Sequence, residues 1–289
     1  MDGKTRIVQL EDGGQLAVDE YGDPSGTPVV FCHGWPSSRS MAALTHEAAC
    51  DLNVRIISPD RPGIRGSSFS AGRKLADWPA IVSQLVDELG LRKFRVLGIS
   101  GGGPYAFATA HAMPERVEAI AVVSGAPPIA GLADHSGLLK LYRWMLALRD
   151  ANPALLRACF HVIRPFASMK PPIRFLPLFL KFFQPCDADV LRDSRAFESC
   201  FESSRQAWRT SADGVMADAE IYAAPWGFAL EDIRVPVRLW HGTRDRTFSF
   251  RLAEQLAARL PVCEFRLVEG AGHYSLPIRH IREILADLI

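Results

Sequence analysis

The chain has 289 residues, of which 48% are hydrophobic, so it is long enough to bury a sizeable core. Its 33 basic and 32 acidic residues nearly cancel and form no dense basic run, which argues against nucleic acid or an anionic membrane as a partner. The start, MDGKTRIVQLEDGGQL, lacks the apolar core of a signal peptide, and no stretch approaches the ~20 apolar residues of a bilayer span. We therefore expect a cytoplasmic protein with no integral membrane segment and a small-molecule substrate, and composition leaves its oligomeric state open.

Cysteine usage bears on metals and redox chemistry. The six cysteines show no C-x-x-C spacing, which argues against a zinc site and against a disulfide scaffold. We interpret them as mostly buried free thiols. They are Cys32, Cys50, Cys159, Cys186, Cys200 and Cys263. We expect no metal and no cofactor.

The N-terminal third predicts the edge of a sheet. Residues 5–10 and 15–21 are short alternating runs on either side of Asp12-Gly13-Gly14, which is typical of a β-hairpin. A continuous apolar strand over residues 28–32 follows, and its loop, HGWPSS, leads into a helical run capped by Ser37 or Ser38. Residues 54–58 predict a further strand.

The middle of the chain alternates strands and helices. The pattern predicts a helix over 75–89, a strand over 94–99, a helix over 101–112 and a strand over 117–123. Such alternation, with strands that are apolar on both faces, indicates a parallel sheet covered by helices on both sides.

The alternation stops after Ser124 and resumes about a hundred residues later. Residues 128–230 have helical patterns, many prolines and no convincing strand, so we interpret them as a helical cap (lid) domain. The core domain then comprises residues 1–127 and 231–289. Its second part predicts a strand at 235–240, a helix at 249–259, a strand at 262–268 and a helix at 277–288.

The stretch FRVLGISGGGPYAFATA places Ser100 at the turn between a buried strand and a helix. A sharp corner there exposes the serine hydroxyl but crowds the backbone, and Gly98 and Gly102 relieve the crowding. The alternative is a dinucleotide fingerprint formed by Gly101, Gly103 and Ala106. That fingerprint needs an acidic residue at the end of the next strand, whereas Glu118 stands at its beginning.

Three further polar loops follow strands of the predicted parallel sheet, whose carboxyl ends form the usual ligand-binding edge. With the Ser100 turn, the loops are 33–38, 242–247 and 270–275. The nucleophile, acid and base then follow in the chain order of nucleophile-elbow hydrolases, with Ser100 before Asp245 and His273. His273 would remove the Ser100 proton, and Asp245 would orient His273 and stabilise its imidazolium.

These motifs resemble those of the α/β-hydrolase family in kind, order and spacing. The matching segments are HGWP at 33–36, GISGG at 98–102, HGTRD at 241–245 and GAGH at 270–273, and the resemblance covers residues 5–124 and 232–289. It implies an α/β-hydrolase fold with an eight-stranded, mostly parallel sheet flanked by helices, with an antiparallel second strand and a helical cap inserted after the sixth. HGWP also resembles the loop of serine esterases, perhydrolases, epoxide hydrolases and haloalkane dehalogenases, but the last two carry an aspartate where this chain has Ser100.

The resemblance extends to the groups around the nucleophile. The oxyanion hole would use the backbone N–H of Gly101 and an N–H of the His33 loop, that of Trp35. We interpret His33 as making structural hydrogen bonds within its loop. The segment 60–67 resembles the family's D-x-x-G-x-G-x-S loop, with Arg65 inserted among the glycines, and we interpret it as structural.

The cap supplies candidate substrate-pocket residues. The apolar segment 175–183 is either cap core or an acyl-binding wall, and the sequence leaves both readings open. The aromatic candidates for the pocket are Phe179 from this segment and, elsewhere in the cap, Tyr142, Trp144, Phe201, Trp208, Tyr222 and Trp226. Since the motifs supply no extra charged residue, we expect a neutral ester with an apolar acyl or alcohol group, and poor turnover of charged substrates.

The resulting hypothesis is a cofactor-free serine carboxylesterase that acts through an acyl-Ser100 intermediate. Two alternatives stay open: a small-ligand receptor that keeps the triad with little turnover, and a perhydrolase, thioesterase, lactonase or acyltransferase. Asp245 could also be a surface ion-pair partner of Arg244 or Arg246, in which case Asp218 and Glu220 are the next candidate acids.

Overall fold

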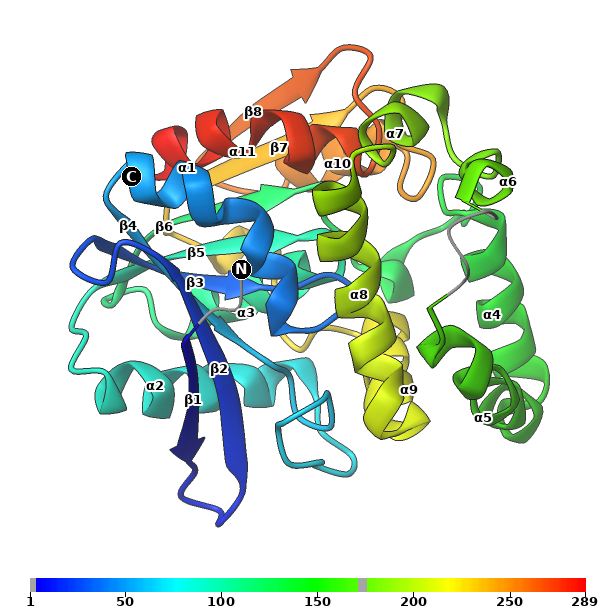
Figure 1. Ribbon diagram of the computed structural model, residues 1–289, viewed down its shortest axis with the longest axis horizontal. Helices are drawn as coiled ribbons and strands as arrows, with labels where there is room; N and C mark the ends of the chain where they lie inside the picture. Colours follow the sequence, from blue (N-terminus) through cyan, green and yellow to red (C-terminus); the bar gives the residue numbers. More distant parts are fainter. Residues whose placement is uncertain (1–3, 171–175) are drawn as a thin grey trace.

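A single mixed sheet organises the protein. The computed structural model describes residues 4–170 and 176–289 and has eight strands in the order β1-β2-β4-β3-β5-β6-β7-β8 (Figure 1). Strand β2 runs antiparallel to both of its neighbours, and the other strands are parallel. The strands are β1 Lys4–Gln9, β2 Gln15–Gly22, β3 Thr27–Cys32, β4 Val54–Pro59, β5 Phe94–Ile99, β6 Val117–Val123, β7 Val237–Gly242 and β8 Cys263–Val268. The predicted sheet is confirmed.

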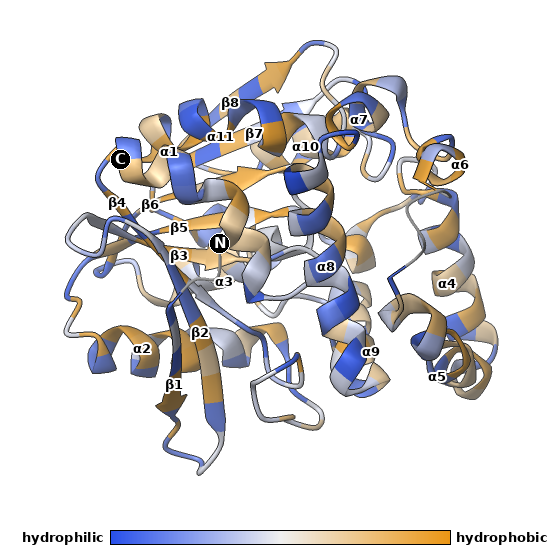
Figure 2. Ribbon diagram, in the orientation of Figure 1, coloured by the Kyte–Doolittle hydropathy of each residue, from blue (hydrophilic) through white to orange (hydrophobic). Residues whose placement is uncertain are grey.

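Helices cover both faces of this sheet because its central strands are apolar on both sides. On β3, Val30 belongs to the apolar cluster under helices α2, α3 and α10, while Val29 and Phe31 belong to the cluster under α1 and α11. Figure 2 shows the central strands as largely hydrophobic. These helices are α1 His46–Asp51, α2 Trp78–Glu88, α3 Gly103–Ala112, α10 Phe250–Ala257 and α11 Ser275–Leu288.

The segment between β6 and β7 contributes helices without a named strand in its described part. They are α4 Lys140–Ala151, α5 Pro153–Ser168, α6 Leu176–Leu180, α7 Pro185–Val190, α8 Ser194–Thr210 and α9 Ala212–Ala223, and they gather at one end of the sheet (Figure 1). Leu156, Phe160 and Trp208 form an apolar cluster with Ile64 from the loop after β4. Hydrophobic packing thus anchors the segment to the sheet.

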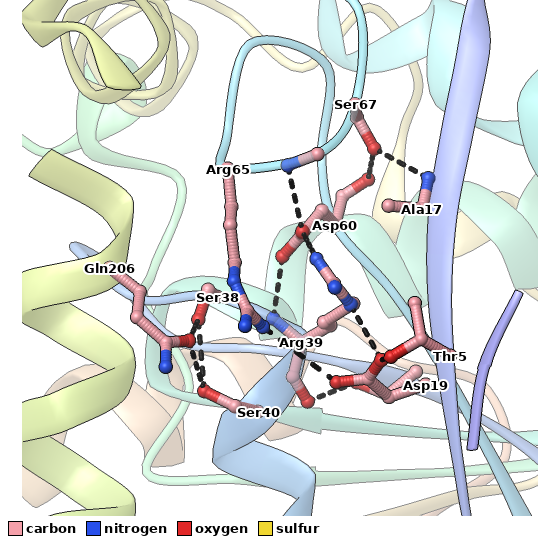
Figure 3. A network of polar contacts seen from close by, with 12 residues as sticks. Thr5, Ala17, Asp19, Ser38, Arg39, Ser40, Asp60, Arg65, Ser67 and Gln206 are labelled. Atoms are coloured by element: carbon pink, nitrogen blue, oxygen red, sulfur yellow. Dashed lines mark hydrogen bonds and ion pairs between the residues drawn. The ribbon is translucent and has the colours of Figure 1, made fainter. Parts of the chain in front are cut away.

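A buried ion network fixes the loops that follow β3 and β4 (Figure 3). The Arg39 guanidinium bonds Asp19 on β2, at 2.7 Å from Nε to Oδ1, and also pairs with Asp60, whose Oδ1 accepts the Arg39 backbone N–H at 2.7 Å. Ser38 and Ser40 reach the Gln206 side chain on α8. Because isolated buried charges are costly, this paired arrangement holds both loops in one position.

Two local predictions need correction. The run after β3 begins as a 3₁₀-helix, Arg39–Thr45, before α1, and Ser38 stands at its N-cap without a side-chain capping bond because its hydroxyl bonds Ser40 and Gln206 instead. Strand β7 begins at Val237, two residues later than expected. In the described part of the chain, no helix combines the length and apolarity that crossing a bilayer requires.

Candidate active site

The turn after β5 carries Ser100 in a strained backbone. Ser100 has a φ of 54° and opens a 3₁₀-helix, Ser100–Gly102, that continues into α3. A Cβ at Gly98 would lie 2.7 Å from the Gly102 carbonyl oxygen, and one at Gly102 would lie 1.9 Å from that of Cys32. Both positions therefore require glycine, as the sequence predicted, and the corner leaves Ser100 at the carboxyl edge of the sheet.

Loops from the far end of the sheet bring His273 and Asp245 to this serine. His273, between β8 and α11, places Nε2 at 2.9 Å from Ser100 Oγ and Nδ1 at 2.8 Å from Asp245 Oδ2. The other carboxylate oxygen of Asp245 accepts the backbone N–H groups of Thr247 and Phe248 at 2.7 and 3.0 Å. The structure thus assembles the three predicted side chains in one hydrogen-bonded chain.

Electrostatics reinforce this chain. Burial lowers the pKa of His273, but the charge and hydrogen bond of Asp245 outweigh it, so the pKa lies above its ordinary value. Burial raises the pKa of Asp245, but the charge and hydrogen bond of His273 prevail and hold it below its ordinary value. Asp245 is therefore an ionised carboxylate that favours the imidazolium form of its partner.

Sequence reasoning missed Asp187 on α7. Its carboxylate accepts three consecutive backbone N–H groups, from His273 at 3.1 Å, Tyr274 at 3.0 Å and Ser275 at 2.7 Å. These N–H groups stand at the start of α11, where intrahelical acceptors are lacking. A Cβ at Gly272 would lie 2.5 Å from the same carboxylate, so glycine lets it approach. Asp187 thus holds the His273 loop from the inserted helical segment.

His241, which the sequence did not identify as part of the site, lies beside Asp245. Its Nε2 lies 2.9 Å from the Phe248 carbonyl oxygen and 3.5 Å from Asp245 Oδ2. Burial lowers its pKa below the ordinary value even though the Asp245 charge opposes this. A neutral His241 that donates to Phe248 leaves the Asp245 charge available to His273.

The predicted oxyanion donors lie beside Ser100. Trp35 is held by its indole, which donates to the Val215 carbonyl on α9 at 2.8 Å. Tyr222, also on α9, donates to the Gly101 carbonyl at 2.9 Å. A Cβ at Gly101 would lie 2.6 Å from the Tyr222 hydroxyl and 2.8 Å from Trp35 Cβ, so only glycine fits. Among the described residues, neither the Trp35 nor the Gly101 backbone N–H has a hydrogen-bond acceptor.

A buried arginine controls the Trp35 loop. Arg61 donates to the carbonyls of His33 at 2.6 Å and Gly34 at 2.7 Å, and its Nε bonds Asp218 on α9 at 2.7 Å. Arg73 also pairs with Asp218, and both arginines are almost fully buried. Burial raises the pKa of Asp218, but the Arg61 and Arg73 charges overcome it and lower that pKa to about 2. Asp218 is thereby committed to this network.

The remaining polar candidates are His33 and Glu220. His33 Nδ1 lies 3.0 Å from the Gly34 carbonyl oxygen, a contact within its own loop, and burial keeps its pKa well below the ordinary value. Glu220, the other alternative acid, pairs with Arg149 at 2.7 Å near the surface. Neither residue contacts Ser100 through a hydrogen bond.

Two pockets meet at Ser100. The narrower has an empty volume of about 600 Å³, counted into open solvent, and is lined by Ser100, Gly101 and mainly apolar side chains, including Ile129, Leu146, Leu156 and Tyr222. The wider has an empty volume of about 1930 Å³, counted into open solvent, and is lined by Ser100 and His273 together with Phe182 and Phe183. Trp35 and Tyr142 border both pockets. The site is therefore a junction with an apolar arm and a broader, more polar arm.

The predicted pocket aromatics divide accordingly. Tyr222 lines the narrow pocket, as predicted. Trp144 is 52% exposed on α4, and Trp226 packs in the core against Phe107. Phe179 packs within an aromatic cluster with Phe183, Phe197 and Phe201. None of these three side chains lines either pocket beside Ser100. Of the other aromatic candidates, Tyr142 lines both pockets, Phe201 lines the wide one, and Trp208 packs against Phe160. Phe175 lies outside the described residues.

Metal sites in proteins are usually built from several His, Cys, Asp or Glu side chains. Within residues 4–170 and 176–289, no group of three or more His, Cys, Asp or Glu side chains is placed to hold a metal ion.

An eight-stranded sheet with a serine, histidine and carboxylate at its carboxyl edge defines a hydrolase class. The family model for the alpha/beta hydrolase family matches residues 29–287, and the chain belongs to this family. It is 34% identical over 169 residues to a non-heme chloroperoxidase from Streptomyces lividans; the match covers 55% of this chain and 58% of that protein, so the chain spans little more than half of that relative.

Two other similarities extend over most of the chain. It is 28% identical over 248 residues to a pimeloyl-[acyl-carrier protein] methyl ester esterase from Aromatoleum aromaticum, covering 85% of this chain and 90% of that protein. Its structure is similar to that of an esterase from Exiguobacterium antarcticum, with a TM-score of 0.71, 18% identity and 98% coverage of both chains. At this identity, the structural likeness shows the fold alone.

The Asp218 network yields a stability prediction. We expect Asp218→Asn to destabilise the protein by about 3–5 kcal/mol, because it leaves two buried arginines without their carboxylate. The control is Asp213→Asn on the same helix, which breaks a partly exposed pair with Arg157 and should cost less than about 1 kcal/mol. Urea unfolding followed by circular dichroism measures both values. Equal losses in the two variants would show that the buried network does not stabilise the fold.

Proposed function

We propose that this hydrolase is a cofactor-free serine carboxylesterase that forms an acyl-enzyme on Ser100. The observation that carries the proposal is the hydrogen-bonded chain from Ser100 Oγ through the His273 ring to the Asp245 carboxylate, with distances of 2.9 and 2.8 Å. The name of the Aromatoleum relative, an ester hydrolase, supports ester chemistry.

The geometry supports a two-stage reaction. His273 Nε2 takes the proton of Ser100 as the hydroxyl attacks the ester carbonyl, and then donates that proton to the departing alcohol. Asp245 fixes the ring with Nδ1 protonated and stabilises the imidazolium. Water then repeats the sequence on the acyl-enzyme and releases the acid.

The negative charge that develops on the carbonyl oxygen is stabilised by the backbone N–H groups of Trp35 and Gly101. The Gly34 carbonyl and the Trp35 N–H belong to one peptide group, and Arg61 donates to that carbonyl at 2.7 Å. A charged donor on the carbonyl polarises the peptide and strengthens its N–H as a donor. In this account, Arg61 is a positioning residue for the oxyanion hole.

In this proposal, the two halves of the ester substrate occupy the two pockets. His273 must protonate the leaving group, and among the two pockets it lines the wider one. The alcohol half therefore occupies the wider pocket, and the acyl half occupies the narrow pocket beside Gly101. The apolar lining of the narrow pocket favours an apolar acyl chain, at about 0.8 kcal/mol per buried methylene.

The helical segment 128–230 acts in this proposal as a cap over the core formed by residues 1–127 and 231–289. Its side chains line both pockets, with Tyr222 in the narrow one and Phe183 in the wide one. It also supplies Asp187 and Asp218, which hold the His273 and Trp35 loops. The cap thus shapes the site and holds its loops in place.

A second acceptor is favoured by one specific finding. The Streptomyces relative is named a non-heme chloroperoxidase, so hydrogen peroxide is a candidate acceptor in place of water. Peroxide would attack the acyl-Ser100 ester and release a peracid. Comparing product from acetyl ester with and without hydrogen peroxide separates the two acceptors, and steady multiple turnover separates either from a receptor with little turnover.

The first test concerns Ser100. We expect an alkyl fluorophosphonate to label the folded protein stoichiometrically at Ser100 and to abolish ester hydrolysis, because His273 activates this hydroxyl. Peptide mass spectrometry locates the label. The matched control is the Ser124→Ala variant, which should still label; the Ser124 hydroxyl is buried and has no hydrogen-bond partner among the described residues. Labelling elsewhere, or none at all, would refute the proposal.

The second test concerns the acid and the pH profile. Neutral His273 is the competent base, so kcat/KM should rise with pH through an apparent pKa above the ordinary histidine value of about 6.5. We expect Asp245→Asn to lower kcat by ~10⁴ and to move this limb to lower pH, because burial then dominates.

The control is Asp51→Asn, an exposed carboxylate paired with Arg282, which should leave the profile in place. Steady-state rates from about pH 5 to 9 measure the limb. A limb at the same pH in Asp245→Asn and the parent protein would contradict the assignment of Asp245.

A further inference from the structure

Three basic side chains line the wide pocket beside Ser100. They are Lys140 and Arg143 from the first turn of α4 and Arg246 from the loop after β7. None of them belongs to an ion pair among the described residues, and the Arg246 guanidinium lies against the neutral side-chain amide of Gln184. All three are exposed and reachable from solvent. The lining of the pocket therefore has three basic side chains against one acidic side chain, Asp187, and its net charge is positive.

The acidic groups nearby are already committed. Asp187 is the one acidic side chain among the described residues that line the wide pocket, and it accepts three backbone N–H groups. Asp134 stands outside it, and hydrogen bonds from Ser136 lower its pKa, with a smaller contribution from the Arg143 charge. Asp245 is occupied by His273. An anion entering this pocket would meet three basic side chains against one carboxylate, that of Asp187, which already accepts backbone N–H groups.

The placement of two of these cations runs against helix electrostatics. The N-terminus of a helix carries a partial positive charge, so basic residues in the first turn are unfavourable and acidic ones are preferred. Helix α4 has no acidic residue in its first turn and has Lys140 and Arg143 there instead. Departures from such a local rule are expected at functional sites, and here a bound anion would relieve the repulsion.

We infer that the wide pocket binds an anionic group, a carboxylate or a phosphate, carried by the leaving alcohol of the substrate, through Lys140, Arg143 and Arg246. This rests on the proposed esterase function, which places the leaving group on the His273 side. The substrate class is then an ester between an apolar acid and an anionic alcohol. It revises the expectation that charged substrates are poor, which held that the site had no extra charged residue.

A matched pair of esters tests the inference. The neutral 2-nitrophenyl hexanoate and the anionic 3-hexanoyloxy-4-nitrobenzoate share the acyl chain and the nitrophenol, and differ by one carboxylate on the leaving group. We expect kcat/KM for the anionic ester to exceed that for the neutral one by roughly tenfold, since each exposed ion pair contributes about two- to fivefold. The advantage should shrink between about 0.05 and 1 M salt.

Charge variants distinguish an effect of the pocket residues on kcat/KM from an effect of the net charge of the protein. In the triple variant Lys140→Gln, Arg143→Gln and Arg246→Gln, the ratio of the two kcat/KM values should fall to near one. The control triple variant Arg195→Gln, Arg259→Gln and Arg282→Gln removes the same charge from surface pairs away from this pocket and should keep the ratio. The single Lys140→Gln and Arg246→Gln variants should each lower it by about two- to fivefold.

The possible outcomes distinguish failure of the anion subsite from failure of the proposed esterase function. If Ser100-dependent hydrolysis of the neutral ester occurs but the anionic ester has no advantage, or keeps its advantage in the pocket triple variant, the anion subsite is refuted and the esterase stands. If neither ester is hydrolysed, both proposals fall. A third hexanoyl ester, with an aryl phosphonate in place of the carboxylate on the nitrophenol, then identifies the anion. A larger advantage in kcat/KM for this dianionic ester than for the carboxylate ester indicates a phosphate-bearing alcohol.

Discussion

The buried Arg61 guanidinium is the interaction on which the site depends. It bonds the carbonyls of His33 and Gly34 on one side and the carboxylate of Asp218 on the other. A buried charge is costly unless it is paired and hydrogen-bonded. These three bonds therefore hold the loop after β3 and helix α9 in one relative position. That position sets where the Trp35 N–H points and where Tyr222 meets Gly101.

The His273 loop is held in a similar way. The sheet supplies Ser100, Asp245 and His273 at the ends of its strands, while the inserted helices supply the groups that hold their loops. Asp187 fixes the His273 loop just as Asp218 fixes the Trp35 loop. Displacement of these helices would therefore disturb the positions of the His273 and Trp35 loops, in addition to opening the pocket.

The sequence predicts the core well because its signals are local. Glycine spacing around Ser100 and the loops after strands identify the three side chains of the proposed triad, since neighbouring strand ends must converge at one edge of a parallel sheet. Asp187 and Lys140 carry no such signal. Asp187 lies 86 residues before His273 and on a six-residue helix, so its role depends on how the inserted helices pack, which amphipathic pattern alone does not determine. For the same reason the sequence does not reveal that Trp144 on α4 lies outside both pockets.

The central claim is that the Trp35 and Gly101 N–H groups stabilise charge on a group bonded to Ser100. The most direct measurement is a crystal structure of the protein with a hexyl phosphonate bonded to Ser100 Oγ. The account predicts one phosphonyl oxygen at about 2.7–3.1 Å from both backbone nitrogens, with the alkyl chain in the narrow apolar pocket. A phosphonyl oxygen that faces away from these nitrogens, or an alkyl chain in the wide basic pocket, would contradict it.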